Sequence, residues 1–185
     1  MIIYIHGFGS SGLGGKASLF SECFSENIIL PSLSYVPTLA IDTLEQLIKL
    51  LLSKKEQLSL IGSSLGGYYA MYLASKYHLK AVLINPAITP YKTLDKIGMA
   101  TNYYDLTSFE VTQEHIDALK GFEVDVIENQ NNFMVLLQKD DDVLDYKDAV
   151  NKLPHAFLHI EEGGSHTFDG IERYFEKIEY FFNNS

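Results

Sequence analysis

Six short apolar runs, rich in β-branched and aromatic residues, alternate with helical patterns along this chain of 185 residues. The runs cover residues 2–5, 28–30, 58–61, 81–84, 133–137 and 156–160. Strands that alternate with helices form parallel sheets, because the chain has to cross one face of the sheet before the next strand begins. The sequence therefore predicts a three-layer α/β protein with about six mostly parallel strands and helices on both faces.

The third run leads into a turn motif that places a serine between two glycines. Leu58–Ile61 is followed by Gly62-Ser63-Ser64-Leu65-Gly66, and a helical pattern begins directly afterwards. A strand, a G-x-S-x-G turn and a helix in this order are typical of a nucleophile elbow, in which the serine sits on a sharp turn. Glycine is needed on both sides because a β-carbon there would clash with nearby backbone. Ser64 is therefore the candidate nucleophile.

A serine nucleophile of this kind needs an acid and a histidine, which follow it along the chain in that order. Asp140, Asp141 and Asp142 come after the fifth run, and His166 lies on a glycine-rich loop after the sixth. The carboxyl ends of parallel strands meet at one edge of a sheet, so these segments can converge on Ser64. His166 would take the serine proton, and one aspartate would orient the imidazole. From the residues alone, Asp140 and Asp141 are about equally suitable.

The loop after the first run is the expected source of an oxyanion donor. In this architecture one donor lies on a loop after an earlier strand, and the other is the residue after the nucleophile. These positions predict that the backbone N–H groups of Phe8 and Leu65 form the oxyanion hole. His6 stands at the strand end before this loop, and we expect it to orient the loop by hydrogen bonding rather than to act as the base.

The same loop also matches a dinucleotide-binding motif, but only in part. Gly7-Phe8-Gly9-Ser10-Ser11-Gly12 fits G-x-G-x-x-G, whereas Leu30-Pro31-Ser32 takes the place of the acidic residue that would bind the ribose. In addition, a formal net charge of −10 opposes binding to nucleic acid or to an anionic membrane surface. Neither partner is expected.

The cysteine content and the apolar runs limit the cofactors and the compartment. The chain has one cysteine, Cys23, so no internal disulfide can form and the cytoplasm is the expected location. Its neighbours Phe20 and Phe24 predict that Cys23 is buried in the core. No Cys/His cluster has the spacing of a metal site, and we expect neither a metal nor an organic cofactor. No apolar run approaches the ~18 residues of a membrane-spanning helix.

The chain length fits one domain, which we expect to cover residues 1–185. Residues 86–131 form a long excursion between two predicted strands, with scattered aromatic residues and one or two short helical patterns. Such an excursion is either a functional cap or lid, or a peripheral helical pair that only shields the sheet edge.

Five segments spread over nearly the whole chain carry these motifs. They are Ile3-Tyr4-Ile5-His6-Gly7-Phe8, Gly62-Ser63-Ser64-Leu65-Gly66-Gly67-Tyr68-Tyr69-Ala70, Asn85-Pro86-Ala87, Val143-Leu144-Asp145-Tyr146 and Glu162-Gly163-Gly164-Ser165-His166. Together they resemble the YqiA-like bacterial esterases of the α/β-hydrolase superfamily. The family pattern has Gly-Asp-Glu before Val-Leu-Asp-Tyr, so the resemblance implies that Asp141 is the acid and that Asp140 replaces the usual glycine.

The resemblance implies a compact hydrolase fold that lacks the first strands of larger relatives. It also implies a serine esterase that cleaves small-molecule carboxylic esters through Ser64, His166 and Asp141, with a covalent acyl-enzyme. Two other functions stay open. An acyl-CoA thioesterase would use the same three residues, and a small-molecule binding protein could keep the fold without the chemistry.

Overall fold

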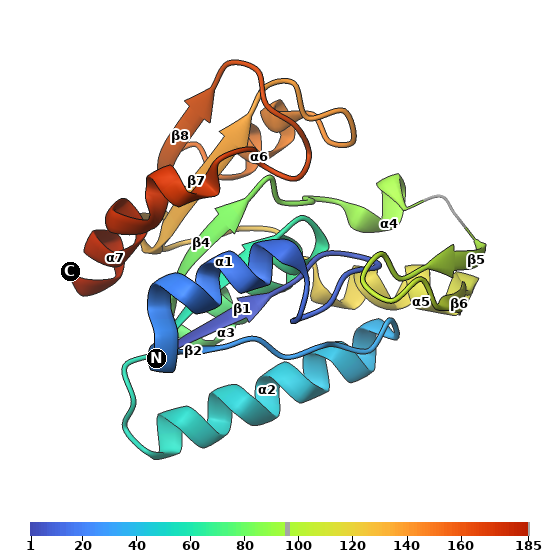
Figure 1. The fold of residues 1–185 in the computed structure, drawn as a ribbon, viewed down its shortest axis with the longest axis horizontal. Helices are drawn as coiled ribbons and strands as arrows, with labels where there is room; N and C mark the ends of the chain where they lie inside the picture. The colour runs from blue at the N-terminus through green and yellow to red at the C-terminus, as the bar shows by residue number, and fades with distance from the viewer. Residues whose placement is uncertain (95–96, 185) are drawn as a thin grey trace.

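The computed structural model describes residues 1–94 and 97–184, in which a parallel sheet forms the centre. The strands of this sheet are β1 (Ile2–Ile5), β2 (Ile28–Ile29), β3 (Ser59–Ser63), β4 (Lys80–Ile84), β7 (Phe133–Gln138) and β8 (Phe157–Glu161). Their order is β2-β1-β3-β4-β7-β8, and every neighbouring pair is parallel. Helices cover both faces (Figure 1), which confirms the predicted fold class.

Two helices from opposite ends of the chain cover one face of the sheet. They are α1 (Gly15–Phe24) and α7 (Phe175–Asn183), the second preceded by the 3₁₀ turn Ile171–Tyr174. Phe20 and Ile178 are fully buried there, against Tyr4 and Ile61 of the strands. Since strand side chains alternate between the two faces, Ile3 and Ile5 point to the opposite layer.

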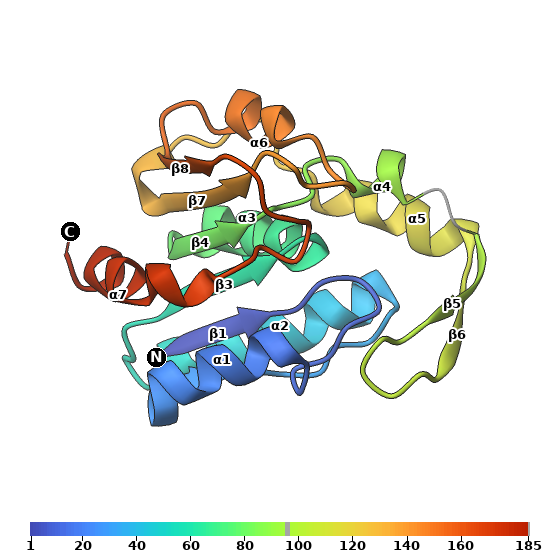
Figure 2. The same ribbon diagram turned by 45° about the horizontal axis from the view of Figure 1, so that its top comes forward.

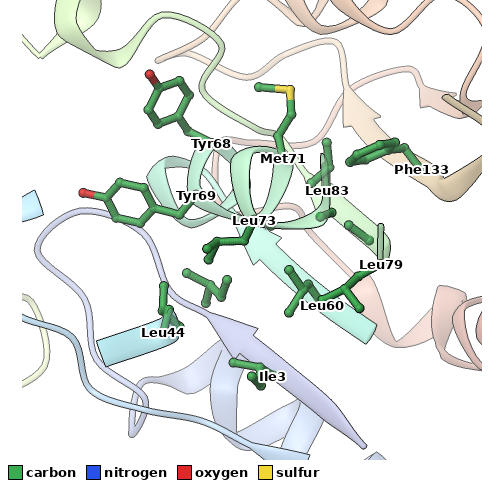
Figure 3. Close-up of a cluster of buried hydrophobic side chains, with 14 of the residues drawn as sticks. Ile3, Leu44, Leu60, Tyr68, Tyr69, Met71, Leu73, Leu79, Leu83 and Phe133 are labelled. Atoms are coloured by element: carbon green, nitrogen blue, oxygen red, sulfur yellow. The ribbon is translucent and has the colours of Figure 1, made fainter. Parts of the chain in front are cut away.

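The other face carries the larger part of the core. It is covered by α2 (Pro37–Ser53), α3 (Leu65–Tyr77) and α6 (Tyr146–Lys152). Figure 3 shows Leu73 of α3 and Leu44 of α2 close to Ile3 and Leu60 of the strands. This packing fixes α3 on the sheet, and with it the turn between β3 and α3 that carries Ser64.

Residues 86–131 contain two short helices and a β-hairpin. The helices are α4 (Pro90–Thr93) and α5 (Gln113–Leu119), and the hairpin consists of β5 (Gly98–Thr101) and β6 (Ser108–Val111). The remaining 3₁₀ turns of the described chain are Ser25–Asn27, Lys120–Phe122 and Gln130–Asn132. The hairpin forms a separate antiparallel pair and projects beyond the carboxyl ends of the parallel strands (Figure 2). Residues 95 and 96 of this segment lie outside the described part.

The predicted burial of Cys23 is wrong, because the structure exposes this residue to solvent. Ala17 and Phe20 define the inward face of α1, and Phe24 packs beside them. Cys23 lies on the last turn of the helix, outside this row, so its proximity to two aromatic residues in the sequence does not bring it into the core.

Candidate active site

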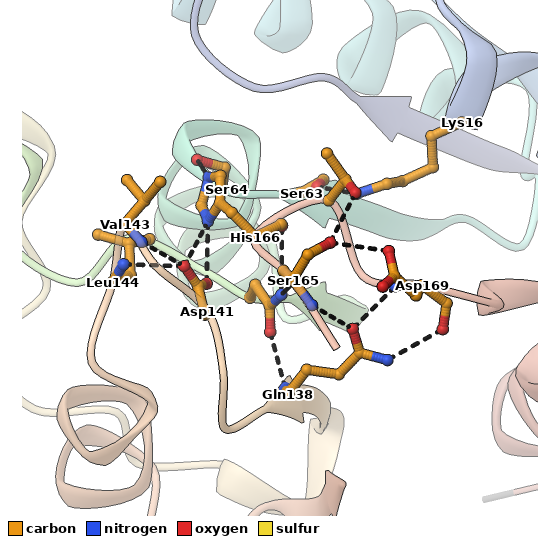
Figure 4. Close-up of polar contacts among 12 residues, drawn as sticks. Lys16, Ser63, Ser64, Gln138, Asp141, Val143, Leu144, Ser165, His166 and Asp169 are labelled. Carbon is orange, nitrogen blue, oxygen red and sulfur yellow. Dashed lines mark hydrogen bonds and ion pairs between the residues drawn. The ribbon is translucent and has the colours of Figure 1, made fainter. Parts of the chain in front are cut away.

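Three side chains from separate loops meet at the carboxyl edge of the sheet. Ser64 follows β3, Asp141 follows β7, and His166 follows β8. The Nε2 atom of His166 lies 2.9 Å from Ser64 Oγ, and its Nδ1 atom lies 3.0 and 2.9 Å from the carboxylate oxygens of Asp141. Figure 4 shows the imidazole between the hydroxyl and the carboxylate. The structure therefore brings together the three residues that the sequence predicts as a triad.

The turn that carries Ser64 has a backbone conformation that residues with a β-carbon rarely adopt. Its angles are φ 55° and ψ −120°. A β-carbon added at Gly62 would lie 2.2 Å from the carbonyl oxygen of Gly66, and one added at Gly66 would lie 2.0 Å from that of Ile5. Both clashes are with backbone, so the two glycines let α3 begin directly against β1 and β3.

Asp141 has the surroundings of a carboxylate that stays ionised. Its Oδ1 atom accepts hydrogen bonds from the N–H groups of Val143 and Leu144, both at 2.9 Å. Burial acts to raise the pKa of this carboxyl, but the hydrogen bonds from His166 and from the two N–H groups lower it below its ordinary value. Asp140 is exposed, and the structure places Asp141, not Asp140, against the imidazole.

Gln138, at the end of β7, anchors the loop that carries His166. It is 2% exposed, and its Oε1 atom accepts the N–H groups of Ser165 at 3.1 Å and Asp169 at 2.8 Å. Its Nε2 atom donates to the carbonyl oxygen of Asp169. Gly164 has φ +84°, and a β-carbon there would lie 2.0 Å from Gln138 Oε1 and 2.8 Å from Gln138 Cβ, so another residue would be strained and would displace Gln138.

Asn85 holds the same loop from the neighbouring strand β4. Its Nδ2 atom donates to the carbonyl oxygens of Ser165 at 2.9 Å and His166 at 3.2 Å, and its Oδ1 atom accepts the N–H of Gln138. Sequence reasoning missed both Asn85 and Gln138 as supports of the site. The available signal was a polar residue at the end of each apolar run, where parallel strands gather functional groups.

Two backbone N–H groups lie where the sequence predicts the oxyanion donors. Leu65 is the first residue of α3, so its N–H has no partner within the helix. Phe8 lies on the loop after β1, and a β-carbon at the preceding Gly7 would come within 3.2 Å of Ser64 Cβ, which shows how near this loop is to the serine. Among the residues that the structure describes, neither N–H donates a hydrogen bond.

His6 holds the loop after β1 and is not positioned as a base. Its Nε2 atom accepts the N–H of Leu33 at 2.9 Å, so this nitrogen carries no proton, and Nδ1–H donates to the carbonyl oxygen of Gly7 at 2.8 Å. Burial lowers the pKa of His6, although the hydrogen bond to Gly7 acts in the opposite direction. In a trans peptide the C=O and N–H point apart, so fixing the Gly7 carbonyl also directs the N–H of Phe8.

Lys16, on the first turn of α1, contacts Ser63, the residue before Ser64. The sequence did not predict this contact. Its Nζ atom donates to Ser63 Oγ at 2.8 Å (Figure 4). Burial lowers the pKa of the Lys16 ammonium to about 8, although the carboxylate of Asp141 acts to raise it. A positive charge that is partly removed from water therefore lies beside the turn that carries Ser64.

A cavity of about 480 Å³ opens at Ser64 and His166. Its other walls include Phe8, Leu94, Met99, Ala100, Tyr103 and Val143. None of the described residues around it is an acidic residue, a lysine or an arginine. Apolar side chains therefore lie next to the hydroxyl of Ser64 on the described walls of the cavity.

Within residues 1–94 and 97–184, no group of three His, Cys, Asp or Glu side chains is placed to hold a metal ion. In the same part of the chain, every helix is too short or too polar to cross a membrane.

A family model described as "Uncharacterised protein family (UPF0227)" matches residues 1–183. The chain belongs to the UPF0227 family. Among the relatives, the UPF0227 protein YcfP of Salmonella paratyphi A is 27% identical over 189 residues, and YcfP of Escherichia coli O9:H4 is 26% identical over 188 residues. Each alignment covers 98% of both chains. Membership of UPF0227 confirms the family resemblance that the sequence motifs indicate.

Solved structures with the same fold as this UPF0227 member are α/β hydrolases. A monoacylglycerol lipase from Paleococcus ferrophilus aligns with a TM-score of 0.73 and 15% identity, over 100% of this chain and 94% of the lipase. Est1E from Butyrivibrio proteoclasticus aligns with a TM-score of 0.72 and 14% identity, over 99% and 88% of the chains. At these identities the likeness establishes the fold, which is that of the α/β hydrolases.

Proposed function

We propose that this protein is a serine hydrolase that cleaves carboxylic esters. The observation that carries the proposal is the continuous hydrogen-bonded line from Ser64 Oγ through the imidazole of His166 to the carboxylate of Asp141. This arrangement of a hydroxyl, a base and an orienting acid activates a serine that is otherwise a weak nucleophile. Membership of a hydrolase superfamily that includes esterases and lipases supports it.

In the proposed reaction, Ser64 Oγ attacks the ester carbonyl while His166 Nε2 takes its proton. Asp141 accepts the Nδ1–H bond and stabilises the imidazolium that forms. The N–H groups of Phe8 and Leu65 bind the carbonyl oxygen as it becomes negative. The imidazolium then gives its proton to the departing alcohol, which leaves an acyl group on Ser64. Water, deprotonated by the same histidine, releases the acid and restores the hydroxyl.

The substrate class follows from the walls of the cavity. Its described walls lack charged residues other than the candidate base, so we propose an ester whose acyl and alcohol parts are both uncharged. An acyl-CoA carries several phosphate charges, and the described wall residues include no lysine or arginine to pair with them, so we propose an oxyester rather than a thioester. We also propose that the chain is a single domain of residues 1–185 in which residues 86–131 act as a cap. The proposed reaction uses no cofactor. We further propose that the protein is cytoplasmic.

The proposal is tested with the variant Ser64→Ala and an esterase assay on 4-nitrophenyl acetate and butyrate. Loss of the hydroxyl should lower kcat by a factor of about 10⁴ or more, with unchanged circular dichroism and Tm. A fluorophosphonate probe should label the wild type at Ser64 alone, as mapped by mass spectrometry. Hydrolysis that persists in Ser64→Ala, or labelling at another residue, would refute the assignment.

A further inference from the structure

The β5–β6 hairpin lies against the loop that carries the proposed oxyanion donor Phe8. We call residues 7–12 the donor loop. The backbone N–H of Tyr103, in the hairpin turn, donates to the carbonyl oxygen of Gly9 at 2.7 Å. The side chain of Asn102 adds a longer contact of 3.5 Å to the carbonyl oxygen of Ser10. The hairpin therefore contacts the backbone of the donor loop at Gly9 and Ser10, the two residues directly after Phe8.

The two segments approach each other so closely that only glycine fits between them. Gly9 has φ +62°, and a β-carbon there would lie 2.9 Å from the carbonyl oxygen of Thr101 and 3.2 Å from the ring of Tyr103. The first of these neighbours is backbone, which has little freedom to move aside. The close fit restricts how far the donor loop can shift relative to the hairpin.

A second contact between the hairpin and the donor loop is an aromatic cluster of Phe8, Tyr35 and Phe109. The ring of Phe109, on β6, meets the ring of Phe8 edge to face at 5.5 Å between centroids. The same ring stacks on Tyr35, at 4.8 Å between centroids. Aromatic pairs of this geometry contribute about 0.5–1.5 kcal/mol each beyond the area they bury. Phe109 thus packs against the side chain of Phe8, whose N–H is the proposed oxyanion donor.

The same hairpin also forms a wall of the substrate cavity. Met99, Ala100, Thr101 and Tyr103 line it opposite His166, although Met99 is 71% and Tyr103 75% exposed. These large exposed side chains have no core to pack against in the described chain. A substrate in the cavity would therefore contact the hairpin directly.

We propose that the β5–β6 hairpin is a positioning element for the oxyanion hole, in which Phe109 fixes the Phe8 peptide. This inference rests on the proposed function, because the oxyanion hole matters only if an ester is cleaved. It assigns to Phe109 an effect on the transition state, although the residue lies outside the cavity that contains Ser64. We therefore expect Phe109 to affect kcat rather than substrate binding.

The test compares Phe109→Ala with Phe109→Leu and with the matched control Tyr104→Ala. Removal of a whole oxyanion donor costs about 10²- to 10³-fold in kcat, so a loosened donor should lower kcat by about 10- to 100-fold. KM for 4-nitrophenyl butyrate should change less than about twofold. Leucine should restore part of kcat, because it keeps an apolar contact with Phe8. Tyr104 is an exposed residue in the turn of the same hairpin, and its replacement should leave kcat unchanged.

Hydrogen exchange followed by mass spectrometry tests the same inference without an activity assay. Phe109→Ala should speed the exchange of a peptide that covers the donor loop, while a peptide that covers β4 exchanges as in the wild type. Unchanged kcat in a folded Phe109→Ala variant, or a rise in KM alone, would overturn the proposal. If the wild type cleaves no ester, the proposed function fails, and unchanged exchange of the donor loop would then overturn the positioning role separately.

Discussion

Asp141 and Asp140 are neighbours in the chain with opposite surroundings, which makes them a matched pair for mutation. Asp141→Asn should lower kcat by about 10⁴-fold, because an amide favours the wrong tautomer of the imidazole. Asp140→Asn should leave kcat within about twofold of the wild type, since Asp140 is exposed and its backbone N–H bond to Gly163 is retained. Steady-state kinetics on one ester measures both. A larger effect at Asp140 would reassign the acid.

Lys16 should make the stability of the protein depend on pH in the alkaline range. Its folded pKa of about 8 lies below the ~10.4 of an unfolded lysine, so between these values the unfolded chain binds more protons. The free energy of unfolding therefore rises with pH in this window. Relative to Lys16→Met, the wild type should gain about 1–2 kcal/mol between about pH 7 and pH 9.5. Urea unfolding at several pH values measures this difference, and a constant difference would contradict it.

The sequence could predict Ser64 and His166 as a candidate pair because each stands in a recognisable local context. The serine is flanked by glycines between a strand and a helix, and the histidine lies on a glycine-rich loop after the last strand. The choice between Asp140 and Asp141 needed either a family resemblance or coordinates. Adjacent side chains in a loop point in different directions, and only the folded loop decides which one faces the imidazole.

At the level of elements, Gln138 at the end of β7 is one of two neutral side chains, with Asn85, that hold the loop carrying His166. Gln138→Met keeps the size of this side chain but leaves the N–H groups of Ser165 and Asp169 without their acceptor. A buried donor without a partner costs about 1–3 kcal/mol. We expect a clear fall in Tm together with a fall in kcat of about 10-fold or more, because a small displacement of the proposed base, His166, would have a large kinetic effect.

A suitable control for this variant is Gln130→Met, which also removes one side-chain acceptor from a backbone N–H. Gln130 Oε1 accepts the N–H of His155 at the protein surface, in a different loop. Differential scanning fluorimetry and ester kinetics should show a small change in Tm and none in kcat. Equal kinetic effects of the two variants would mean that Gln138 has no special part in holding the loop.

The six strands of the sheet were predictable, whereas the hairpin was not. Each predicted run matches an observed strand, with ends that differ by at most two residues. Continuous apolar runs identify strands that are buried on both faces. The strands of the hairpin are four residues each, and three of the four residues of β6 are partly or fully exposed. The hairpin is held by contacts with the donor loop. Because that loop is about 90 residues away in the sequence, these contacts produce no local sequence pattern.

On the scale of the whole molecule, the net charge of −10 should influence which substrates approach the cavity. An anionic ester, such as the 4-nitrophenyl monoester of succinic acid, is repelled, and salt screens this repulsion. Its kcat/KM should rise severalfold between about 10 mM and 200 mM NaCl. The neutral 4-nitrophenyl butyrate should show little change. Identical responses of the two esters would indicate that the global field does not reach the site.

The overall architecture could be predicted from the sequence because apolar runs alternate with helical patterns along the whole chain. The positions of Asn85, Gln138 and Lys16 were not, because each acts on a segment that is far away in sequence and close only after folding. The burial predicted for Cys23 failed for a related reason. Proximity to aromatic residues along a helix does not fix which side of the helix faces the sheet.

The positive φ of Ser64 favours glycine at this position, whereas the proposed reaction requires a serine. A serine in this conformation costs of the order of 1–3 kcal/mol, whereas glycine adopts it with little cost. Ser64→Gly should therefore raise the free energy of unfolding, but it also removes the hydroxyl. Under the proposed function, the substitution that would most directly relieve this backbone strain is also the one that would abolish catalysis.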